Sequence, residues 1–274
     1  MSVKIHPTSI VSDKAKLGVN VEIGPFCFVD EDVEIGDNTK LLNSVKIKKY
    51  TKIGNNCTIY DGASIGNIPQ HLGFKGEKTF VEIGNNVTIR EYCTIHRGTT
   101  FDDGITKIED NVYLMAYVHI AHDCKVGEGS IFANNATLGG HVRVGKKVFI
   151  GGLTPVHQWC RIGDYAMIGG GAVVIKDIPP FTRAGRNPAK IFGLNVIGLR
   201  RNGFSNETIK LLKEAYKIVF LRTDVLKEGI EIAKKELPMT PEIKLFLEFL
   251  EQKSKRGIAP EASRKKDKED SLEE

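Results

Sequence analysis

The sequence predicts a mainly β protein, in which a parallel β-helix is followed by a C-terminal α-helical region. Three observations support this prediction. An aliphatic residue recurs at every sixth position over the first two thirds of the chain, the residue four places later is usually small, and the spacing becomes helical after residue 205. We therefore expect a β-helix domain over residues 1–186, a helical domain over 187–257 and a disordered, charged tail over 258–274.

The six-residue repeat begins close to the N-terminus. From Ile5 to Ile65 every sixth residue is Ile, Val or Leu, and the repeat resumes in phase at Ile83. The intervening residues 67–80 lack the repeat, so we predict a loop insertion there. A period of six matches neither an α-helix nor a single flat strand, because these repeat about every 3.6 and every two residues.

A second interruption near residues 101–106 shifts the phase by one position and is also predicted to be a loop. The repeat then continues from Ile108 to Val174. Three repeats, about 18 residues, would close one triangular coil, and neighbouring coils would pair as parallel strands about 4.8 Å apart. The aliphatic side chains would fill the interior, and Gly and Asn would occupy the tight corners, where a positive φ costs Gly little.

This pattern resembles the hexapeptide-repeat proteins. The resemblance implies a left-handed parallel β-helix, which breaks the general preference for right-handed crossovers. The period by itself does not determine the hand. A coil of this kind supplies a scaffold, so function must reside in its corners and loops.

The cysteines occupy the small position of the repeat, four residues after an aliphatic: Cys27, Cys57, Cys93, Cys124 and Cys160. We therefore expect all five to be buried and to pack as small apolar side chains. An odd number of cysteines, with no CxxC motif and no export signal, is typical of a protein in the reducing cytoplasm. Disulfide, zinc and thiol-nucleophile roles are the less favoured alternatives.

Three helices are predicted after residue 205. Ser205 can cap the first, whose sequence ETIKLLKEAYKIVFL places apolar residues on one face. A second helix should span about residues 224–237. Pro238 and Pro241 then precede a third helix, EIKLFLEFLEQKSK.

Composition excludes several classes of protein. The chain has 274 residues, is 41% hydrophobic and 27% charged, and carries a net charge of +5, as expected for a globular protein with a substantial core. No apolar run approaches the roughly 18 residues of a membrane span, and the N-terminus lacks the apolar segment of a signal peptide. The slight excess of Lys and Arg is too weak, and too poor in aromatic–basic clusters, to predict nucleic-acid binding.

Four of the seven histidines fall between residues 119 and 157. Since residues one coil apart should stack, Gly140 would lie on His122, and His141 on Asp123. A glycine above His122 would leave room for a substrate atom, its N–H could stabilise an oxyanion, and Asp123 could orient the imidazole. This arrangement suits general-base acyl transfer, in which a His removes a proton from an attacking hydroxyl or amine.

Two other interpretations of these histidines stay open. They could be solvated corner residues, or zinc ligands as in β-helical relatives of carbonic anhydrase. His119 and His122 are only three residues apart and lack the wider His pair of those relatives. This spacing disfavours a metal.

Six motifs carry a more specific resemblance: HIAHDCKVG, ANNATLGGHV, GGLTPVHQWC, TIHRGT, QHLGFKGE and LRRNGFS. In their order and spacing, over residues 3–257, they resemble the acyl-[acyl-carrier-protein]–UDP-N-acetylglucosamine O-acyltransferases, which catalyse the first step of lipid A synthesis. The resemblance implies a cytoplasmic homotrimer with its sites between subunits. It also implies transfer of a 3-hydroxylated acyl chain from acyl carrier protein to the 3-position of UDP-N-acetylglucosamine or its 3-amino analogue. No metal or diffusible cofactor is needed, because the carrier protein brings the phosphopantetheine.

The resemblance also assigns roles to residues. It makes His122 the catalytic base, Asp123 its orienting carboxylate and Gly140 the oxyanion donor. The other positions that match the family's active site are His119, His141 and His157, then Gln158, Asn195 and Arg201 around the UDP-sugar, and Gln70 and His96 near the sugar and the acyl channel.

Several positions depart from the family pattern: His71, Gly73, Pro188, Ile197 and Asn202. They leave the acyl length open, and also whether the acceptor carries a 3-hydroxyl or a 3-amino group. The alternatives are the later UDP-sugar N-acyltransferase of the same pathway, a CoA-dependent acetyltransferase, the zinc β-helix and a non-catalytic binding module. The segment KIKKYTK could steer an acidic carrier protein, but an ordinary solvated surface is the favoured interpretation.

Overall fold

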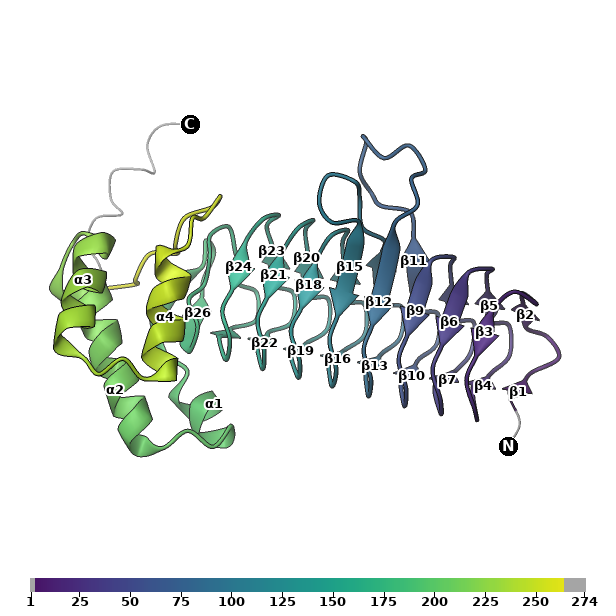
Figure 1. The fold of residues 1–274 in the computed structure, drawn as a ribbon, viewed down its shortest axis with the longest axis horizontal. Helices are drawn as coiled ribbons and strands as arrows, with labels where there is room; N and C mark the ends of the chain where they lie inside the picture. The colour runs from purple at the N-terminus through teal and green to yellow at the C-terminus, as the bar shows by residue number, and fades with distance from the viewer. Residues whose placement is uncertain (1–2, 264–274) are drawn as a thin grey trace.

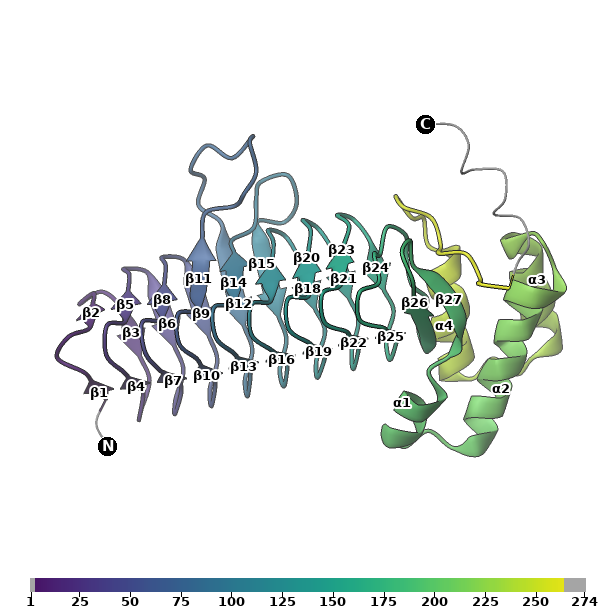
Figure 2. The same cartoon turned by 180° about the vertical axis from the view of Figure 1, so that it is seen from behind.

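The computed structural model describes residues 3–263 of the chain. A left-handed parallel β-helix forms a long triangular prism, and the described α-helices pack together at its C-terminal end (Figures 1 and 2). The predicted fold class is therefore confirmed.

Three sheets form the faces of the prism. The first contains, in order, β1 (Lys4–Ile5), β4 (Glu22–Ile23), β7 (Lys40–Leu41), β10 (Thr58–Ile59), β13 (Thr88–Ile89), β16 (Tyr113–Leu114), β19 (Ile131–Phe132), β22 (Phe149–Ile150), β25 (Met167–Ile168), β26 (Thr182–Gly185) and β27 (Lys190–Leu194). The second contains β2 (Ile10–Val11), β5 (Phe28–Val29), β8 (Lys46–Ile47), β11 (Ser64–Asn67), β14 (Thr94–His96), β17 (His119–Ile120), β20 (Thr137–Leu138) and β23 (Pro155–Val156). The third contains β3 (Lys16–Leu17), β6 (Val33–Ile35), β9 (Thr51–Ile53), β12 (Phe80–Ile83), β15 (Ile105–Ile108), β18 (Lys125–Val126), β21 (Arg143–Val144) and β24 (Arg161–Ile162).

Strand pairing confirms the predicted stacking of coils. In the third sheet Lys125 pairs with Arg143 in parallel register, one coil further along the chain. Across the two interruptions of the repeat, Ile65 pairs with Ile95 and Ile95 with Ile120. The inserted residues therefore leave the prism as loops and do not disturb the stack (Figure 1).

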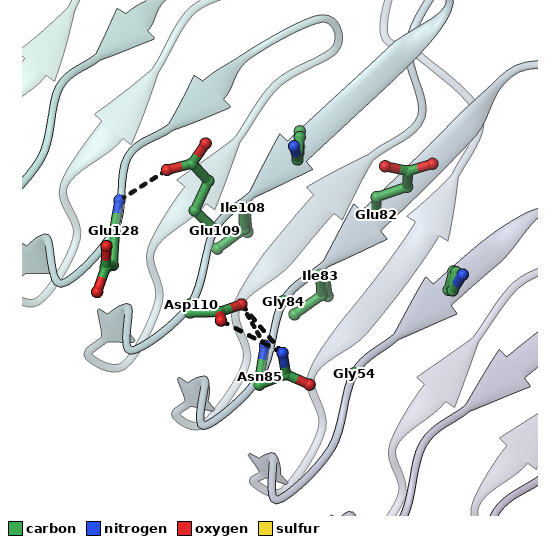
Figure 3. Close-up of a pocket in the computed structure, with 11 residues that line it drawn as sticks. Gly54, Glu82, Ile83, Gly84, Asn85, Ile108, Glu109, Asp110 and Glu128 are labelled. Atoms are coloured by element: carbon green, nitrogen blue, oxygen red, sulfur yellow. Dashed lines mark hydrogen bonds between the residues drawn. The ribbon is translucent and has the colours of Figure 1, made fainter.

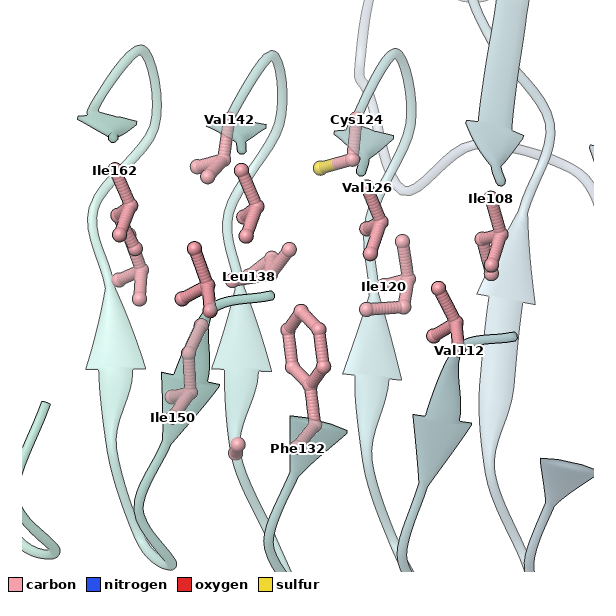
Figure 4. Packing of buried hydrophobic residues seen from close by; sticks show 14 of the residues in the cluster. Ile108, Val112, Ile120, Cys124, Val126, Phe132, Leu138, Val142, Ile150 and Ile162 are labelled. Carbon is pink, nitrogen blue, oxygen red and sulfur yellow. The ribbon is translucent and has the colours of Figure 1, made fainter. Parts of the chain in front are cut away.

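The repeated aliphatic side chains form the interior. Ile120, Leu138 and Ile150 are fully buried, with Phe132 between them (Figure 4). Burying one such side chain contributes about 1.5–3 kcal/mol. Ile5 begins the column yet is 45% exposed, because its strand is the end strand of the first sheet.

The five cysteines share this interior, as predicted. All are free and buried, and burial raises the pKa of the Cys93 and Cys124 thiols to about 12. A thiol in such surroundings stays protonated and unreactive at neutral pH. The structure thus assigns these residues a packing role.

The prediction that Gly and Asn would occupy the corners holds in part: Asn has a positive φ at several corners between the third and first sheets, such as Asn38 and Asn56, but large residues occupy other corners. Where the first sheet leads to the second, four corner residues form an apolar edge, and all of them have a positive φ and are more than half exposed: Phe26, Tyr92, Tyr117 and Leu153. A side chain at this corner projects away from the coil, so large residues fit. Many repeat glycines serve a different purpose: a Cβ on Gly36 would lie 2.8 Å from the backbone oxygen of Gly54 in the next coil.

The C-terminal region contains α1 (Val196–Arg201), α2 (Asn206–Lys217), a π-helical turn (Ile218–Arg222), α3 (Leu226–Glu236) and α4 (Pro241–Glu251). Ser205 caps α2 as predicted, its Oγ accepting from the Thr208 N–H at 3.1 Å. The sequence prediction missed α1 and extended the last helix too far. Among the residues that the structure describes, no helix is both long and apolar enough to cross a membrane.

Two predicted boundaries need correction. The division at residue 186 falls inside an antiparallel hairpin, since β26 pairs with β27 and carries the first sheet on to Leu194. The tail predicted to be disordered from residue 258 begins as ordered chain, because Ile258 bridges to Asp177 and Glu261 to Ile191. The rest of that tail, residues 264–274, lies outside the described residues.

Candidate active site

Both loop insertions and the clustered histidines lie along one edge of the prism. We call this the histidine edge; it comprises the corners that join the second sheet to the third, at residues 68–79, 97–104, 121–124, 139–142 and 157–160. The first two of these corners are the loops that project from the prism in Figure 1. They stand next to the corners that carry the histidines, so inserted residues can reach the histidine side chains.

His122 and Asp123 form a buried pair on this edge. His122 is 7% exposed and Asp123 is completely buried. The His122 Nδ1 lies 2.8 Å from the Asp123 Oδ2. Because an ionised carboxylate can only accept, Nδ1 carries the proton and Nε2 presents a lone pair. This is the tautomer that a general base requires.

Asp123 is held by further hydrogen bonds. Its Oδ1 accepts from the Thr99 N–H at 2.7 Å, its Oδ2 from the Thr99 hydroxyl at 2.6 Å, and its own N–H donates to the Thr106 Oγ1 at 2.8 Å. Burial tends to raise the pKa of the Asp123 carboxyl, but the hydrogen bonds from His122 and Thr99 outweigh burial and lower it. Asp123 is therefore an anion at neutral pH, bonded to the base.

Gly140 lies one coil above His122, as the stacking arithmetic predicted. A Cβ added to Gly140 would overlap the His122 ring, at Cε1 and Nε2. The space that we expected for a substrate atom is thus occupied by the imidazole itself, and only glycine permits this position. Gly140 is buried, and among the described residues its N–H has no acceptor. A buried, unused donor beside a base can stabilise developing negative charge.

His141 forms a second histidine–carboxylate pair next to the first. Its Nδ1 lies 3.1 Å from the Asp102 Oδ2, and its ring stacks on Trp159 with centroids 3.8 Å apart. The ring also meets the His122 ring edge to face, at 5.0 Å. Burial lowers the pKa of His141 more than the bond to Asp102 raises it. Neutral His141 is therefore favoured.

His96 and His119 lie beside this edge, on the adjacent strands β14 and β17 of the second sheet. Their rings meet edge to face at 5.0 Å, and the His119 Nδ1 lies 2.7 Å from the Thr94 hydroxyl. Burial lowers the pKa of His96 to about 4, and it also lowers that of His119. The Nδ1 of His96 is buried without a partner among the described residues. Both rings are thus uncharged groups suited to hydrogen bonding with a polar ligand.

The remaining predicted residues of this edge are more exposed. Gln70 lies on the first loop, and His157 and Gln158 lie one coil beyond His141, with the His157 Nδ1 3.0 Å from the Gln158 carbonyl oxygen. His71, one of the departures from the family pattern, reaches the base: its ring lies 5.2 Å from the His122 ring and 4.7 Å from Phe101.

Asn195 and Arg201 lie at a different edge of the same chain. Both line a pocket of about 830 Å³ between α1 and the first sheet. The Asn195 Oδ1 caps α1 by accepting from the Gly198 N–H at 3.1 Å, and its Nδ2 donates to the Tyr165 carbonyl at 3.0 Å. Tyr165 belongs to the corner between the third and first sheets. A single chain therefore does not bring these two residues to His122.

A further pocket, of about 510 Å³, lies on the third sheet (Figure 3). Its acidic groups link successive coils: Asp110 accepts from the Asn85 N–H at 2.8 Å, and Glu109 accepts from the Glu128 N–H at 3.2 Å. None of the predicted site residues lines this pocket. We interpret its carboxylates as part of the corner structure.

One group of described residues could hold a metal ion: His122, Asp123 and His141, whose ligand atoms lie within 4.8 Å of one another. The ring nitrogens that face the carboxylates already make the hydrogen bonds described above. The expectation that no metal is needed stays a prediction.

Comparison with known proteins places the chain in a family. The C-terminal region, residues 177–259, matches the model of UDP-N-acetylglucosamine O-acyltransferase domain 2, and residues 32–67 and 105–140 match the bacterial transferase hexapeptide model. The acyl-[acyl-carrier-protein]–UDP-N-acetylglucosamine O-acyltransferase of Sulfurihydrogenibium sp. (strain YO3AOP1) is 64% identical over 264 residues, covering 96% of this chain and 97% of that protein. The enzyme of the same name from Thermodesulfovibrio yellowstonii is 55% identical, covering 93% and 98%.

Solved structures agree with the sequence comparison. LpxA from Acinetobacter baumannii superposes with a TM-score of 0.90 at 45% identity, covering 93% of this chain and 99% of that one. The UDP-N-acetylglucosamine acyltransferase from Campylobacter jejuni gives a TM-score of 0.89 at 39% identity, covering 94% and 99%. With matches of this extent in sequence and structure, the chain belongs to the acyl-[acyl-carrier-protein]–UDP-N-acetylglucosamine O-acyltransferase family.

Proposed function

We propose that the protein transfers an acyl group from acyl carrier protein to the 3-position of UDP-N-acetylglucosamine, the first step of lipid A biosynthesis, with His122 as the general base. One observation carries the catalytic assignment. The buried carboxylate of Asp123 fixes the Nδ1 proton of His122, so the Nε2 lone pair is available to a substrate.

The reaction follows from this geometry. Nε2 of His122 takes the proton of the attacking 3-hydroxyl or 3-amino group as that group adds to the thioester carbonyl. The tetrahedral oxyanion is stabilised by the Gly140 N–H. When the intermediate collapses, the C–S bond breaks and the imidazolium returns its proton to the phosphopantetheine sulfur. Asp123 stabilises the imidazolium in the interval, as the carboxylate of a catalytic triad does.

The surroundings favour this chemistry because they are buried. His96 and His119 are neutral and can hydrogen-bond the sugar without adding charge. In a site that excludes water, the attraction between the imidazolium and Asp123 is stronger than in solvent. General-base and oxyanion contributions of this kind are worth about 10²–10⁴-fold and 10²–10³-fold in rate.

We further propose that the active unit is a cytoplasmic homotrimer. Asn195 and Arg201 lie away from the histidine edge of their own chain, so a neighbouring subunit would have to bring such a pair to each His122. The exposed aromatic rings of Tyr92 and Tyr117, stacked 5.3 Å apart on the apolar edge, suit burial between subunits. Arg201 would then face the diphosphate, for which a guanidinium is well suited.

The test is direct. The pure protein is incubated with 3-hydroxyacyl carrier proteins of increasing chain length and with UDP-N-acetylglucosamine or its 3-amino analogue, and product mass is followed. A product identifies the acceptor and chain length together, and activity should survive dialysis against EDTA. Tight UDP-sugar binding without turnover across the whole series would instead support a binding module. About one zinc per subunit, by elemental analysis, would favour the metal alternative.

A further inference from the structure

Several hydrogen-bond donors surround the carboxylate that orients His122. The Asp123 Oδ2 accepts from the Thr99 hydroxyl at 2.6 Å and from the His122 Nδ1 at 2.8 Å. The Nδ1 of His141 lies only 3.7 Å from the same oxygen. A carboxylate oxygen has two in-plane lone pairs, and two donors already use them. A third N–H turned toward this oxygen would compete with His122 for it.

Asp102 removes this competition. Its Oδ2 lies 3.1 Å from the His141 Nδ1, closer than the Asp123 oxygen. Arg143 holds Asp102 in place, with its Nη2 donating to the same Oδ2 at 2.6 Å, while its Nη1 donates to the Asp123 carbonyl oxygen. Arg143 therefore connects both acidic residues and sets their separation.

The ring of His141 is also fixed in its plane. Trp159 stacks on it with an angle of only 5° between the rings, and Lys255 places its Nζ on the Trp159 ring, 3.0 Å from the centroid. A stacked imidazole can still flip by 180°. The hydrogen-bond partner of Nδ1 determines which of the two orientations the ring adopts. Since a carboxylate only accepts, Asp102 selects the Nδ1–H form and leaves the Nε2 of His141 as an acceptor.

The second loop insertion delivers Asp102 to this position. Asp103, the next residue, accepts from the Lys125 Nζ at 2.8 Å, and Lys125 also donates to the Ile105 carbonyl at 2.7 Å. Phe101, the preceding residue, packs against His71. The insertion is thus anchored on both sides of Asp102, to the prism through Asp103 and to the first loop through Phe101, as a rigid support for one side chain must be.

We propose that Asp102 is a positioning residue: it accepts the hydrogen bond of the His141 Nδ1–H, so that, of these two histidines, only His122 bonds to the carboxylate of Asp123. The proposal rests on the proposed function in that His122 is the base. It gives the 97–104 loop a purpose, since the loop supplies a second carboxylate beside the first. Asp102 acts through His141 and Asp123 and does not itself contact the reacting atoms.

The first measurement needs no substrate. Histidine side chains labelled with ¹⁵N report their tautomer by NMR, and each spectrum is assigned with single His variants. In the native protein we expect His122 and His141 both to carry the proton on Nδ1. In D102A we expect His141 to lose that preference and the Nδ1 proton resonance of His122 to shift or broaden. D103N is the matched control, because it weakens the tie to Lys125 and leaves both histidine–carboxylate pairs intact.

Kinetics form the second measurement. With acyl carrier protein and UDP-sugar substrates, D102A should lower kcat on the order of 10-fold, as loss of an outer hydrogen-bond partner does at other sites, with KM for the UDP-sugar nearly unchanged. The conservative variant D102E should recover part of that loss, and D103N should leave kcat within about twofold. Melting temperature and oligomer size check that each variant is folded.

The possible results test the role of Asp102 separately from the proposed function. Native His141 protonated on Nε2, or D102A with native tautomers and native kcat, would overturn the role of Asp102. A native protein that shows the expected tautomers but no acyl transfer with any carrier protein would leave the Asp102 contact standing and refute the proposed function. If D103N lowers kcat and disturbs the tautomers as much as D102A does, loop anchoring explains the data and the specific role of Asp102 is wrong.

Discussion

Two edges of the prism use the same backbone for different purposes. At the corner between the third and first sheets, Asn38 and Asn56 have φ values of 56° and form an exposed ladder, with the Asn38 Nδ2 donating to the Asn56 Oδ1 at 3.3 Å. On the histidine edge, Asp123 and His141 have φ values of 61° and 62°, yet both are buried. The conformation is common to both edges, and the side chains with the loops that cover them make the difference.

The difference between the two edges shows where chemistry arises in a repetitive fold. Stacking places equivalent atoms at equal intervals along every edge, so it supplies alignment without selecting a site. Among the described coils, only the histidine edge carries insertions, and these contact His122 and His141 and add the Asp102 carboxylate. Removing water then strengthens every charge interaction there.

The largest expected effect comes from removing the base. His122→Ala should lower kcat on the order of 10²–10⁴-fold, because proton removal from the nucleophile is lost. Steady-state kinetics measure the change, and gel filtration checks the assembly. Near-native turnover in this variant would contradict the assignment of His122.

A methyl group at Gly140 should have the next largest effect. Gly140→Ala places a Cβ inside the His122 ring, so the ring must move, and displacement of about 1 Å can cost on the order of 10²-fold in rate. Gly185→Ala is the matched control, since its Cβ would approach Phe192 only to 3.7 Å. Equal activity of the two variants would show that the Gly140–His122 contact does not matter.

The buried histidines also predict how stability depends on pH. Burial lowers the pKa of His96 from 6.5 to about 4, so the unfolded chain binds more protons between these values and stability falls as the pH falls through this window. His96→Asn should remove about 2 kcal/mol of the difference in unfolding free energy between pH 7 and pH 5. Chemical denaturation at both pH values measures it. A His96→Asn variant that shows the native difference would contradict the burial argument.

The smallest effect is expected at the asparagine ladder. Asn38→Gly keeps a residue that tolerates positive φ and removes two exposed hydrogen bonds, one from the Asn20 Nδ2 and one to the Asn56 Oδ1, so unfolding should become easier by about 1 kcal/mol, with kcat unchanged. Thermal melting and kinetics test both statements. A clear loss of activity would mean that the ladder edge takes part in function, against the comparison above.

Much of the site was predictable because it follows the period. The stacking of Gly140 on His122, the placement of Asp123 beside it and the burial of the cysteines all result from counting residues along coils. Asn195 shows the limit of such counting. The family resemblance implied a position around the UDP-sugar for Asn195, and within one chain both of its side-chain polar atoms are hydrogen-bonded at another edge, away from His122.

The sequence by itself determined the coil, its interior column and the alignment of residues one coil apart, because these depend on a local repeat that recurs in every coil. Only the tertiary structure decided which carboxylate meets which histidine and how the chain ends. Asp102 reaches His141 across 39 positions, and residues 258–261 dock on Asp177 and Ile191. Such contacts depend on the path of a loop or a returning segment through space, and no period encodes that path.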